Sequence, residues 1–403
     1  MALLTNGSGL RVAVAHNRYQ QPGGEDQVFE REVALLKSAG HDVLSYEVHN
    51  DAVASMSSFS VAARYVWNPT TYGTLRARFA SFRPHVVHVH NTLPLISPAI
   101  LVAARRSGAA VVQTLHNYRM VCPSATLFRD GRPCELCVPQ RLALSGVRHA
   151  CYRNSRSATA AVAGSTFIHR VLRTYAHNVD RFIALTEFAR TTLSKGGVPA
   201  NKLVVKPNFT APIGATHREA GGMALFVGRL SEEKGIRTLM EAWKRHRDLP
   251  PLRIAGDGPL RSEVELQSAQ NGNITALGAL PQGRVPVEMR SAAVLVFPST
   301  WYEGFPMTIV EAFANGLPVV ASRIGSVAEI VTDGEVGLTF TPGDADELAD
   351  RVRRLSNDRD LNARLGAAAL HRYGERYTPE ANLEQLQRIY QEAIEHRNVH
   401  RRR

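Results

Sequence analysis

Two glutamates, Glu303 and Glu311, lie eight residues apart in the stretch WYEGFPMTIVEAFANG. A loop and an apolar helical segment separate them, and Pro306 fits the first turn of that helix, where its missing N–H costs nothing. A carboxylate can accept hydrogen bonds from two vicinal hydroxyls, which sugars and ribose both present. Free backbone N–H groups at the helix start, near residues 305–308, would bind an anion. This pattern predicts a sugar nucleotide, with its hydroxyls on the carboxylates and its diphosphate at the helix start.

A second charged stretch, GRLSEEKG, follows an apolar strand and leads into the next helix. Arg229 and Lys234 place two cations on this short loop, and a nucleotide diphosphate needs both positive charge and backbone N–H donors. A solvated loop with an incidental ion pair is the alternative interpretation. The sequence has no GxxxxGK[ST] motif, which disfavours an ordinary nucleotide triphosphatase.

Apolar strands and helical segments alternate almost throughout the chain, which predicts an α/β protein with parallel, doubly wound sheets. A stretch rich in Gly, Ala, Thr and Pro interrupts the alternation, which then restarts. We therefore expect two Rossmann-like domains that face each other across a cleft, at residues 1–208 and 223–380, with a linker at 209–222. Residues 381–403 read as an amphipathic helix with a basic tail. Ligands of such sheets bind at the carboxyl ends of the strands, where both charged stretches fall.

The bulk composition is that of a globular protein, because 403 residues suffice for two domains and 44% of them are hydrophobic. No apolar run approaches the ~18 to 20 residues of a membrane span. The first residues lack a basic start followed by a long apolar core, so we expect no signal peptide and a cytoplasmic location.

The formal net charge is +12, and arginine supplies most of the basic residues. No acidic residue lies between Glu135 and Asp180, an interval that holds six arginines and three histidines. The simplest interpretation is a solvated basic face. The alternative is a surface for an anionic acceptor, or for peripheral contact with an anionic membrane at its inner face.

The two charged stretches resemble the signature of the retaining GT-B glycosyltransferases of family four, the glycosyl transferases group 1. The segments IAGDGP, GLPVVAS and PNF resemble family elements as well, and the resemblance covers nearly the whole chain. It implies a GT-B fold, a donor held mainly by the C-terminal domain, and a final helix that crosses back to the N-terminal domain. We expect that catalysis needs no cofactor.

The resemblance assigns roles to residues of the C-terminal half. Glu311 would hold the ribose, Glu303 the donor sugar, and Arg229 and Lys234 the diphosphate. The residues around the helix start complete the predicted donor site: Gly304, Phe305, Met307 and Thr308.

In the N-terminal half, a loop with Gly23 and Gly24 precedes a helix that begins with Glu25. A glycine pair before a helix is weak evidence alone, but family members carry a similar loop that faces the donor phosphate and the acceptor. We therefore place Gly24 in the donor site and Glu25 on the acceptor side.

Histidines end two of the predicted strands. His116 follows TL in AAVVQTLHN, and the resemblance places it beside the reacting sugar carbon, where it would position or stabilise rather than attack. A packed or capping histidine is the alternative. The segment VVHVHN offers His88, His90 and Asn91 at another strand end, and we expect His90 and Asn91 to line the acceptor side.

All four cysteines fall within residues 117–155, a Cys-rich insertion of the N-terminal domain. They are Cys122, Cys134, Cys137 and Cys151. Cytosolic proteins rarely keep disulfides, so a structural zinc site with four thiolate ligands is one prediction, and thiols without metal or a redox pair are the alternatives. A site closed by four sulfurs would leave no open position for catalysis.

The sequence thus predicts a glycosyltransferase that moves a sugar from a nucleotide-diphosphate sugar to a polysaccharide, lipid-linked or small-molecule acceptor. A phosphorylase or an epimerase on the same fold is the nearest alternative. A zinc-stabilised nucleic-acid-binding protein is a more distant one, because the basic interval is poor in aromatic residues and no nucleic-acid-binding fold is recognised. The segments DAD at 344–346 and DRD at 358–360 match a DxD metal motif only superficially.

Overall fold

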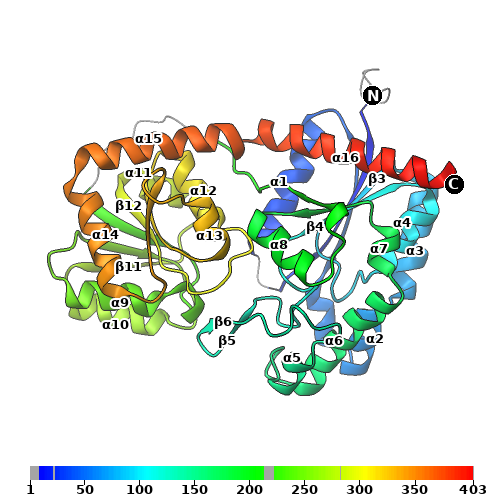
Figure 1. The fold of residues 1–403 in the computed structure, drawn as a ribbon, viewed down its shortest axis with the longest axis horizontal. Coiled ribbons are helices and arrows are strands. Elements are labelled where there is room, and N and C mark those ends of the chain that lie inside the picture. Colours follow the sequence, from blue (N-terminus) through cyan, green and yellow to red (C-terminus); the bar gives the residue numbers. More distant parts are fainter. Residues whose placement is uncertain (1–8, 21–22, 213–221, 282, 403) are drawn as a thin grey trace. The chain divides into compact units, whose positions relative to one another are not determined.

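The structure is a computed structural model that describes residues 9–20, 23–212, 222–281 and 283–402, with side chains to residue 399 (Figure 1). The chain forms two compact units. Unit 1 comprises residues 1–126, 135–207 and 382–403, and unit 2 comprises residues 127–134 and 208–381. Most of the linker predicted at 209–222 lies outside the described residues.

Unit 1 is built on a six-stranded sheet with the order β2-β1-β3-β4-β7-β8, in which all neighbouring strands are parallel. Its strands are β1 (Arg11–Arg18), β2 (Asp42–His49), β3 (Val86–Val89), β4 (Ala110–Leu115), β7 (Arg181–Ala184) and β8 (Leu203–Val205). Its helices are α1 (Gly24–Ser38), α2 (Ser58–Val66), α3 (Pro69–Phe82), α4 (Ala99–Ser107), α5 (Leu144–Arg148), α6 (Arg156–Val171), α7 (Thr174–Asn178) and α8 (Glu187–Lys195), with the 3-10 turns η1 (Asn50–Ser55) and η2 (Ala200–Lys202).

The last helix, α16 (Pro379–Arg402), belongs to unit 1 from Asn382 onward. Leu386, Ile389 and Tyr390 are buried in the same apolar cluster as residues of β1 and α1. The prediction of a final helix that returns to the N-terminal domain is therefore confirmed.

Unit 2 is built on a second parallel six-stranded sheet, with the order β11-β10-β9-β12-β13-β14. Its strands are β9 (Met223–Val227), β10 (Leu252–Ala255), β11 (Ile274–Gly278), β12 (Ala292–Phe297), β13 (Val319–Ser322) and β14 (Gly337–Phe340). Its helices are η3 (Glu232–Lys234), α9 (Ile236–Arg245), α10 (Arg261–Gln270), α11 (Arg284–Ser291), α12 (Met307–Ala314), α13 (Gly325–Ile330), α14 (Ala345–Asn357) and α15 (Arg359–Arg376). The segment 127–134 adds a hairpin of β5 (Phe128–Arg129) and β6 (Arg132–Pro133).

The core of unit 2 explains why these residues form strands between helices. Successive residues of β9 face opposite sides of the sheet, so Leu225 packs in one apolar cluster and Phe226 in another. Strands buried on both faces read as continuous apolar runs, as the sequence of this chain does. The prediction of two doubly wound α/β domains is confirmed.

The strand order places two topological switch points, which are the positions where ligands of doubly wound sheets bind. In unit 1 the order reverses between β1 and β3, and in unit 2 it reverses between β9 and β12. The residues after β9 include Arg229 and Lys234, and those after β12 include Glu303. The fold thus brings together two charged stretches that lie some 70 residues apart in the chain.

Candidate active site

The loop after β9 packs closely against the loop after β12 in unit 2. Gly235 has a φ of +71°, and a Cβ there would lie 1.8 Å from the carbonyl oxygen of Pro298, so only glycine fits. The N–H of Thr300 donates to the carbonyl of Glu233 at 2.9 Å. These contacts fix the position of Lys234, which lies between them in the chain.

Lys234 and Glu303 form the central contact of this site. Lys234 Nζ lies 2.6 Å from Glu303 Oε1, which also accepts a hydrogen bond from Ser299 Oγ at 2.9 Å. The ammonium lies 5.7 Å and 5.5 Å from the ring centres of Phe297 and Trp301, within range of a cation–π interaction. The side chain of Glu303 is 7% exposed and that of Lys234 is 22% exposed, so the pair is anchored at the carboxylate and open at the ammonium.

The helix α12 begins at Met307, one residue later than predicted, and Pro306 is its N-cap residue rather than part of its first turn. The cap has non-helical backbone angles, and proline tolerates this position because it needs no N–H there. The first N–H groups of α12 have no partner within the helix and can bind an anion.

Three residues of α12 share its one partly exposed face. Met307, Thr308 and Glu311 are half-buried, whereas the intervening Ile309 and Val310 are buried against the sheet. Residues at spacings of three and four lie on the same side of a helix. Glu311 therefore lies one turn beyond the helix start on the side where a bound anion would meet the N–H groups.

Arg229 has an exposed side chain, and among the described residues its guanidinium has no hydrogen-bond or ion-pair partner. Its backbone is held by the loop after β10, because the N–H of Leu230 donates to the Asp257 carbonyl at 2.9 Å. A Cβ at Gly256 would lie 1.8 Å from the Gly228 carbonyl oxygen, so the close approach of the two loops requires glycine. Arg229 is thus a cation on a fixed loop with its charge available to a ligand.

Gly304 and Phe305 are half-buried, and the Phe305 ring lies 6.1 Å from that of Tyr377.

In unit 1, α1 begins at the exposed Gly24, and its start is closed by a hydrogen bond from the Gly23 N–H to Asp26 Oδ2 at 2.8 Å. Glu25 accepts hydrogen bonds from the Tyr19 hydroxyl and from Asn117 Nδ2, both at 2.9 Å. Burial raises the pKa of Glu25 despite these two donors. Since Asn117 follows His116, the structure brings the glycine loop and the end of β4 together.

Asn91 ties the ends of the strands at the switch point of unit 1. Its side chain donates to the Asn17 carbonyl at 2.9 Å, and the Asn17 N–H donates to the Asn91 carbonyl at 2.9 Å. The predicted acceptor-side role of Asn91 stays a prediction, while its structural role is to hold the two loops together.

His116 is 8% exposed and stacks on His90, with ring centres 5.1 Å apart and 2.9 Å between His116 Nε2 and His90 Nδ1. Burial, and then the neighbouring His90, lower the pKa of His116 well below its usual value. Burial lowers the pKa of His90 to about 4. Both rings are therefore neutral near pH 7. This suits a hydrogen-bonding role for His116, with the more deeply buried His90 next to it in the interior.

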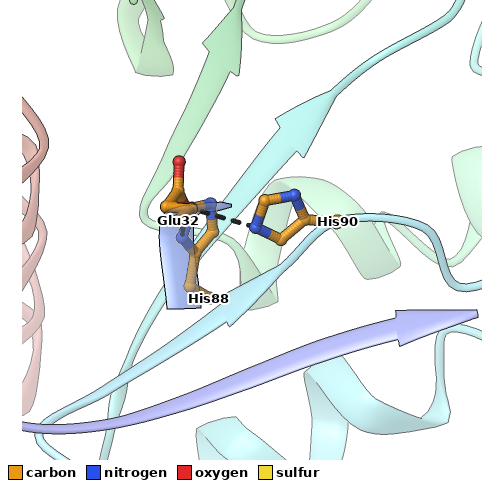
Figure 2. Close-up of side chains that lie close together, drawn as sticks. All are labelled: Glu32, His88 and His90. Carbon is orange, nitrogen blue, oxygen red and sulfur yellow. Dashed lines mark ion pairs between the residues drawn. The ribbon is translucent and has the colours of Figure 1, made fainter. Parts of the chain in front are cut away.

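A buried carboxylate, that of Glu32, lies beside His88 and His90 (Figure 2), and the buried Lys206 completes this cluster. Glu32 Oε1 lies 2.9 Å from His88 Nδ1 and 3.2 Å from His90 Nε2, and Glu32 Oε2 lies 3.2 Å from Lys206 Nζ. The side chains of Glu32 and Lys206 are each 1% exposed. Sequence reasoning missed both, because Glu32 occurs in a helical pattern and Lys206 follows a strand 174 residues later. The only signal was the alternation of histidine and valine in HVVHVHN.

The cysteines are all reduced. Cys122, Cys137 and Cys151 belong to unit 1, and Cys134 belongs to unit 2. Cys137 Sγ lies against Gly146, whose carbonyl accepts a hydrogen bond from the Cys151 N–H at 3.1 Å. In the described part of unit 1, however, the three sulfurs do not all lie within 4.8 Å of one another. The four-thiolate zinc site stays a prediction.

The two DxD segments cap helices. Asp344 accepts hydrogen bonds from the N–H groups of Asp346 and Glu347 at the start of α14, and Asp358 accepts one from Leu361 at the start of α15.

Among the helices that the structure describes, none combines the length and apolar character needed to span a bilayer.

Comparison with known proteins identifies the family. The family model for the glycosyl transferase 4-like domain matches residues 23–208, and that for glycosyl transferases group 1 matches residues 214–372. The chain belongs to the group 1 glycosyl transferases, as its charged stretches predict.

Curated relatives resemble parts of the chain. It is 30% identical over 266 residues to 2-deoxystreptamine glucosyltransferase of Streptomyces kanamyceticus, and the matched segment covers 64% of each chain. It is 32% identical over 177 residues to alpha-D-kanosaminyltransferase of the same organism, covering 42% of this chain and 45% of the relative. It is 34% identical over 232 residues to phosphatidyl-myo-inositol mannosyltransferase of Mycobacterium leprae, covering 54% and 61%. The matched segments thus span less than two thirds of each relative.

Solved structures share the fold over almost the full chain. Alr3699/HepE of Anabaena in complex with UDP has a TM-score of 0.66 at 16% identity, covering 94% of this chain and 99% of that one. Sucrose-phosphate synthase of Thermosynechococcus elongatus has a TM-score of 0.67 at 19% identity, covering 95% and 98%. The two doubly wound units are those of the GT-B fold.

Proposed function

We propose that the protein transfers a sugar from a nucleotide-diphosphate sugar to an acceptor hydroxyl, with retention of the anomeric configuration. The observation that carries the proposal is the Lys234–Glu303 pair at the β9–β12 switch point, directly before the N-terminus of α12. Family membership supports the reaction class, and HepE, which has been solved with UDP-glucose, suggests uridine nucleotides as the first donors to test.

The leaving group carries the charge that the site must stabilise. When the bond between the anomeric carbon and the diphosphate oxygen breaks, negative charge grows on the diphosphate. Arg229, Lys234 and the N–H groups of α12 supply positive charge and donors for it. The acceptor oxygen then bonds to the anomeric carbon on the face that the diphosphate leaves, and the acceptor proton passes to a diphosphate oxygen. This route needs no protein nucleophile.

The two carboxylates bind different parts of the rest of the donor. Glu303, buried and held by Lys234 and Ser299, accepts hydrogen bonds from hydroxyls of the transferred sugar. Glu311, one turn into α12, accepts them from the ribose. Neither acts as a general acid or base in this scheme. The neutral His116 shares a hydrogen bond with a hydroxyl beside the reacting centre.

The acceptor is proposed to be a glycan, a small molecule or a lipid-linked sugar. Apolar side chains of α6 and the residue after it are exposed within the basic interval: Phe167, Ile168, Val171 and Leu172. Exposed apolar residues flanked by arginines suit the surface of an anionic membrane, and this favours an acceptor presented there.

Product analysis tests the reaction. The purified protein is incubated with a nucleotide-diphosphate sugar and, in turn, with a hydroxyl acceptor, orthophosphate or water, and the products are examined by NMR. We expect a glycoside with the donor's anomeric configuration. A sugar phosphate as the main product would establish a phosphorylase, an altered sugar on the nucleotide would establish an epimerase, and an inverted glycoside would contradict retention.

The zinc site is proposed as a structural clip of the region that follows β4. We expect the purified protein to contain about one zinc ion per chain, and the double variant Cys134→Ser/Cys137→Ser to lose it and to unfold at a lower temperature. Elemental analysis and thermal unfolding check this. Metal-free wild-type protein with full transfer activity would rule the clip out.

A further inference from the structure

The buried cluster of Glu32, His88 and His90 (Figure 2), together with Lys206, has no role in the transfer scheme. Its His90 nevertheless lies within hydrogen-bonding distance of His116. One carboxylate oxygen and two imidazole nitrogens close together could hold a divalent cation. The Lys206 ammonium, 3.2 Å from Glu32 Oε2, already neutralises that carboxylate, and a second cation in the same buried space would be repelled. The arrangement therefore suits an ordered chain of hydrogen bonds.

The first link runs from His90 to Glu32. Burial acts to raise the pKa of Glu32, but the Lys206 ammonium and the neighbouring His88 outweigh it and hold that pKa well below its usual value. Glu32 is thus ionised and can only accept. Glu32 Oε1 and His90 Nε2 lie 3.2 Å apart, within hydrogen-bonding distance, although neither atom has an aligned partner among the described residues. The proton of this link belongs to His90 Nε2.

The second link follows from the first. A neutral imidazole carries one proton, so His90 with Nε2–H has a lone pair on Nδ1. That atom lies 2.9 Å from His116 Nε2, which must therefore be the donor. The neutral His116 then has its own lone pair on Nδ1. This atom has no hydrogen-bond partner in the described part of the chain and is not fully enclosed.

We propose that Glu32 and His90 are positioning residues that hold His116 in its Nε2-protonated tautomer, so that His116 Nδ1 faces substrate as a hydrogen-bond acceptor. The partner would be a hydroxyl of the bound sugar or acceptor, an assignment that rests on the proposed function. The opposite tautomer would present an N–H to the same hydroxyl.

Two double variants separate the effect of the hydrogen-bond acceptor at position 32 from the effect of the buried Glu32–Lys206 charges. Glu32→Gln/Lys206→Met and Glu32→Leu/Lys206→Met both remove the buried ion pair together, which avoids leaving one charge unpaired. They differ in whether position 32 retains an oxygen for His90 Nε2. Tyr390→Phe is the control for the rest of the cluster, because it removes the hydroxyl 2.8 Å from His88 Nδ1 and leaves the side chains of Glu32, His90 and His116 unchanged.

The tautomer is read by ¹⁵N NMR of histidine-labelled protein, with the His116 signals assigned by their loss in His116→Gln. We expect Nδ1 of His116 to be unprotonated in wild type, in Tyr390→Phe and in the glutamine variant, and to gain a proton in the leucine variant. A protonated Nδ1 in wild type, or the same state in both double variants, would overturn the proposal. This NMR measurement needs no substrate, so it decides the tautomer even if none of the tested nucleotide sugars supports transfer.

Transfer kinetics give the functional consequence. We expect kcat of the leucine variant to fall about 10-fold to 100-fold below that of the glutamine variant, with the donor KM little changed, as is common when a group that orients a site residue is lost. Equal kcat values in two folded double variants would show that the tautomer does not serve the reaction and would overturn that part of the proposal.

Discussion

Replacing Lys234 by methionine is expected to lower kcat by about 100-fold to 1000-fold, the range seen when one preorganised donor to a developing charge is removed. The ammonium is held 2.6 Å from Glu303 and is partly exposed, so its charge is fixed before the diphosphate leaves. Methionine keeps the unbranched apolar stem of lysine and can still pack against Phe297 and Trp301. The loss should therefore fall on kcat more than on folding.

Lys244→Met is the matched control for this variant. It removes the same charge from an exposed position on α9 of the same unit, away from the strand ends of the switch point. Steady-state kinetics with varied donor, together with thermal unfolding, separate the two effects. If Lys234→Met transferred sugar within about 3-fold of wild type, the role of Lys234 at the diphosphate would be wrong.

Replacing Glu311 by alanine is expected to raise the donor KM by about 10-fold to 150-fold, because a hydrogen bond to a charged group contributes about 1.5 to 3 kcal/mol. The ribose does not change during transfer, so its binding is equally strong in the ground state and the transition state. Glu311 is half-buried on the exposed face of α12, and alanine favours a helix. The fold should therefore be retained.

Glu303→Gln should show the opposite pattern, since Glu303 is proposed to contact the sugar at the reacting centre and to orient Lys234. Here kcat should fall more than KM rises. Glu265→Ala, an exposed change on α10, controls for the loss of a surface carboxylate. If Glu303→Gln and Glu311→Ala changed kcat and KM in the same proportions, the division of roles between the two carboxylates would be contradicted.

The residues proposed for the donor side could be singled out in the sequence because their signals are local. Glu303, Pro306 and Glu311 lie in one short segment, and Lys234 lies in another, each directly after a buried strand. Parallel strands bring their carboxyl ends to one edge, so the pairing of Lys234 with Glu303 follows once the strand order is known. The predicted start of α12 was wrong by one residue, because proline serves equally well at the N-cap and at the first helical position.

The cluster behind His116 could not be predicted in the same way. Its members come from α1, from β3 and the residue after it, and from the residue after β8, and the Lys206–Glu32 contact spans 174 residues. A glutamate in an amphipathic helix normally faces solvent, and nothing local distinguishes Glu32 from its neighbours. The pairing depends on tertiary packing, which places α1 and α16 in the same apolar cluster with the sheet of unit 1.

The central claim is that unit 2 binds a nucleotide-diphosphate sugar through Arg229, Lys234, Glu303, Glu311 and the start of α12. Thermal unfolding with a panel of nucleotide-diphosphate sugars tests it most directly, because a ligand that binds only the folded state raises the unfolding temperature by mass action. We predict that at least one nucleotide sugar raises the unfolding temperature of wild type and of Lys244→Met, and that the rise is much reduced in Lys234→Met and Glu311→Ala. A panel that leaves wild type unchanged, or that shifts all four proteins equally, would contradict the account.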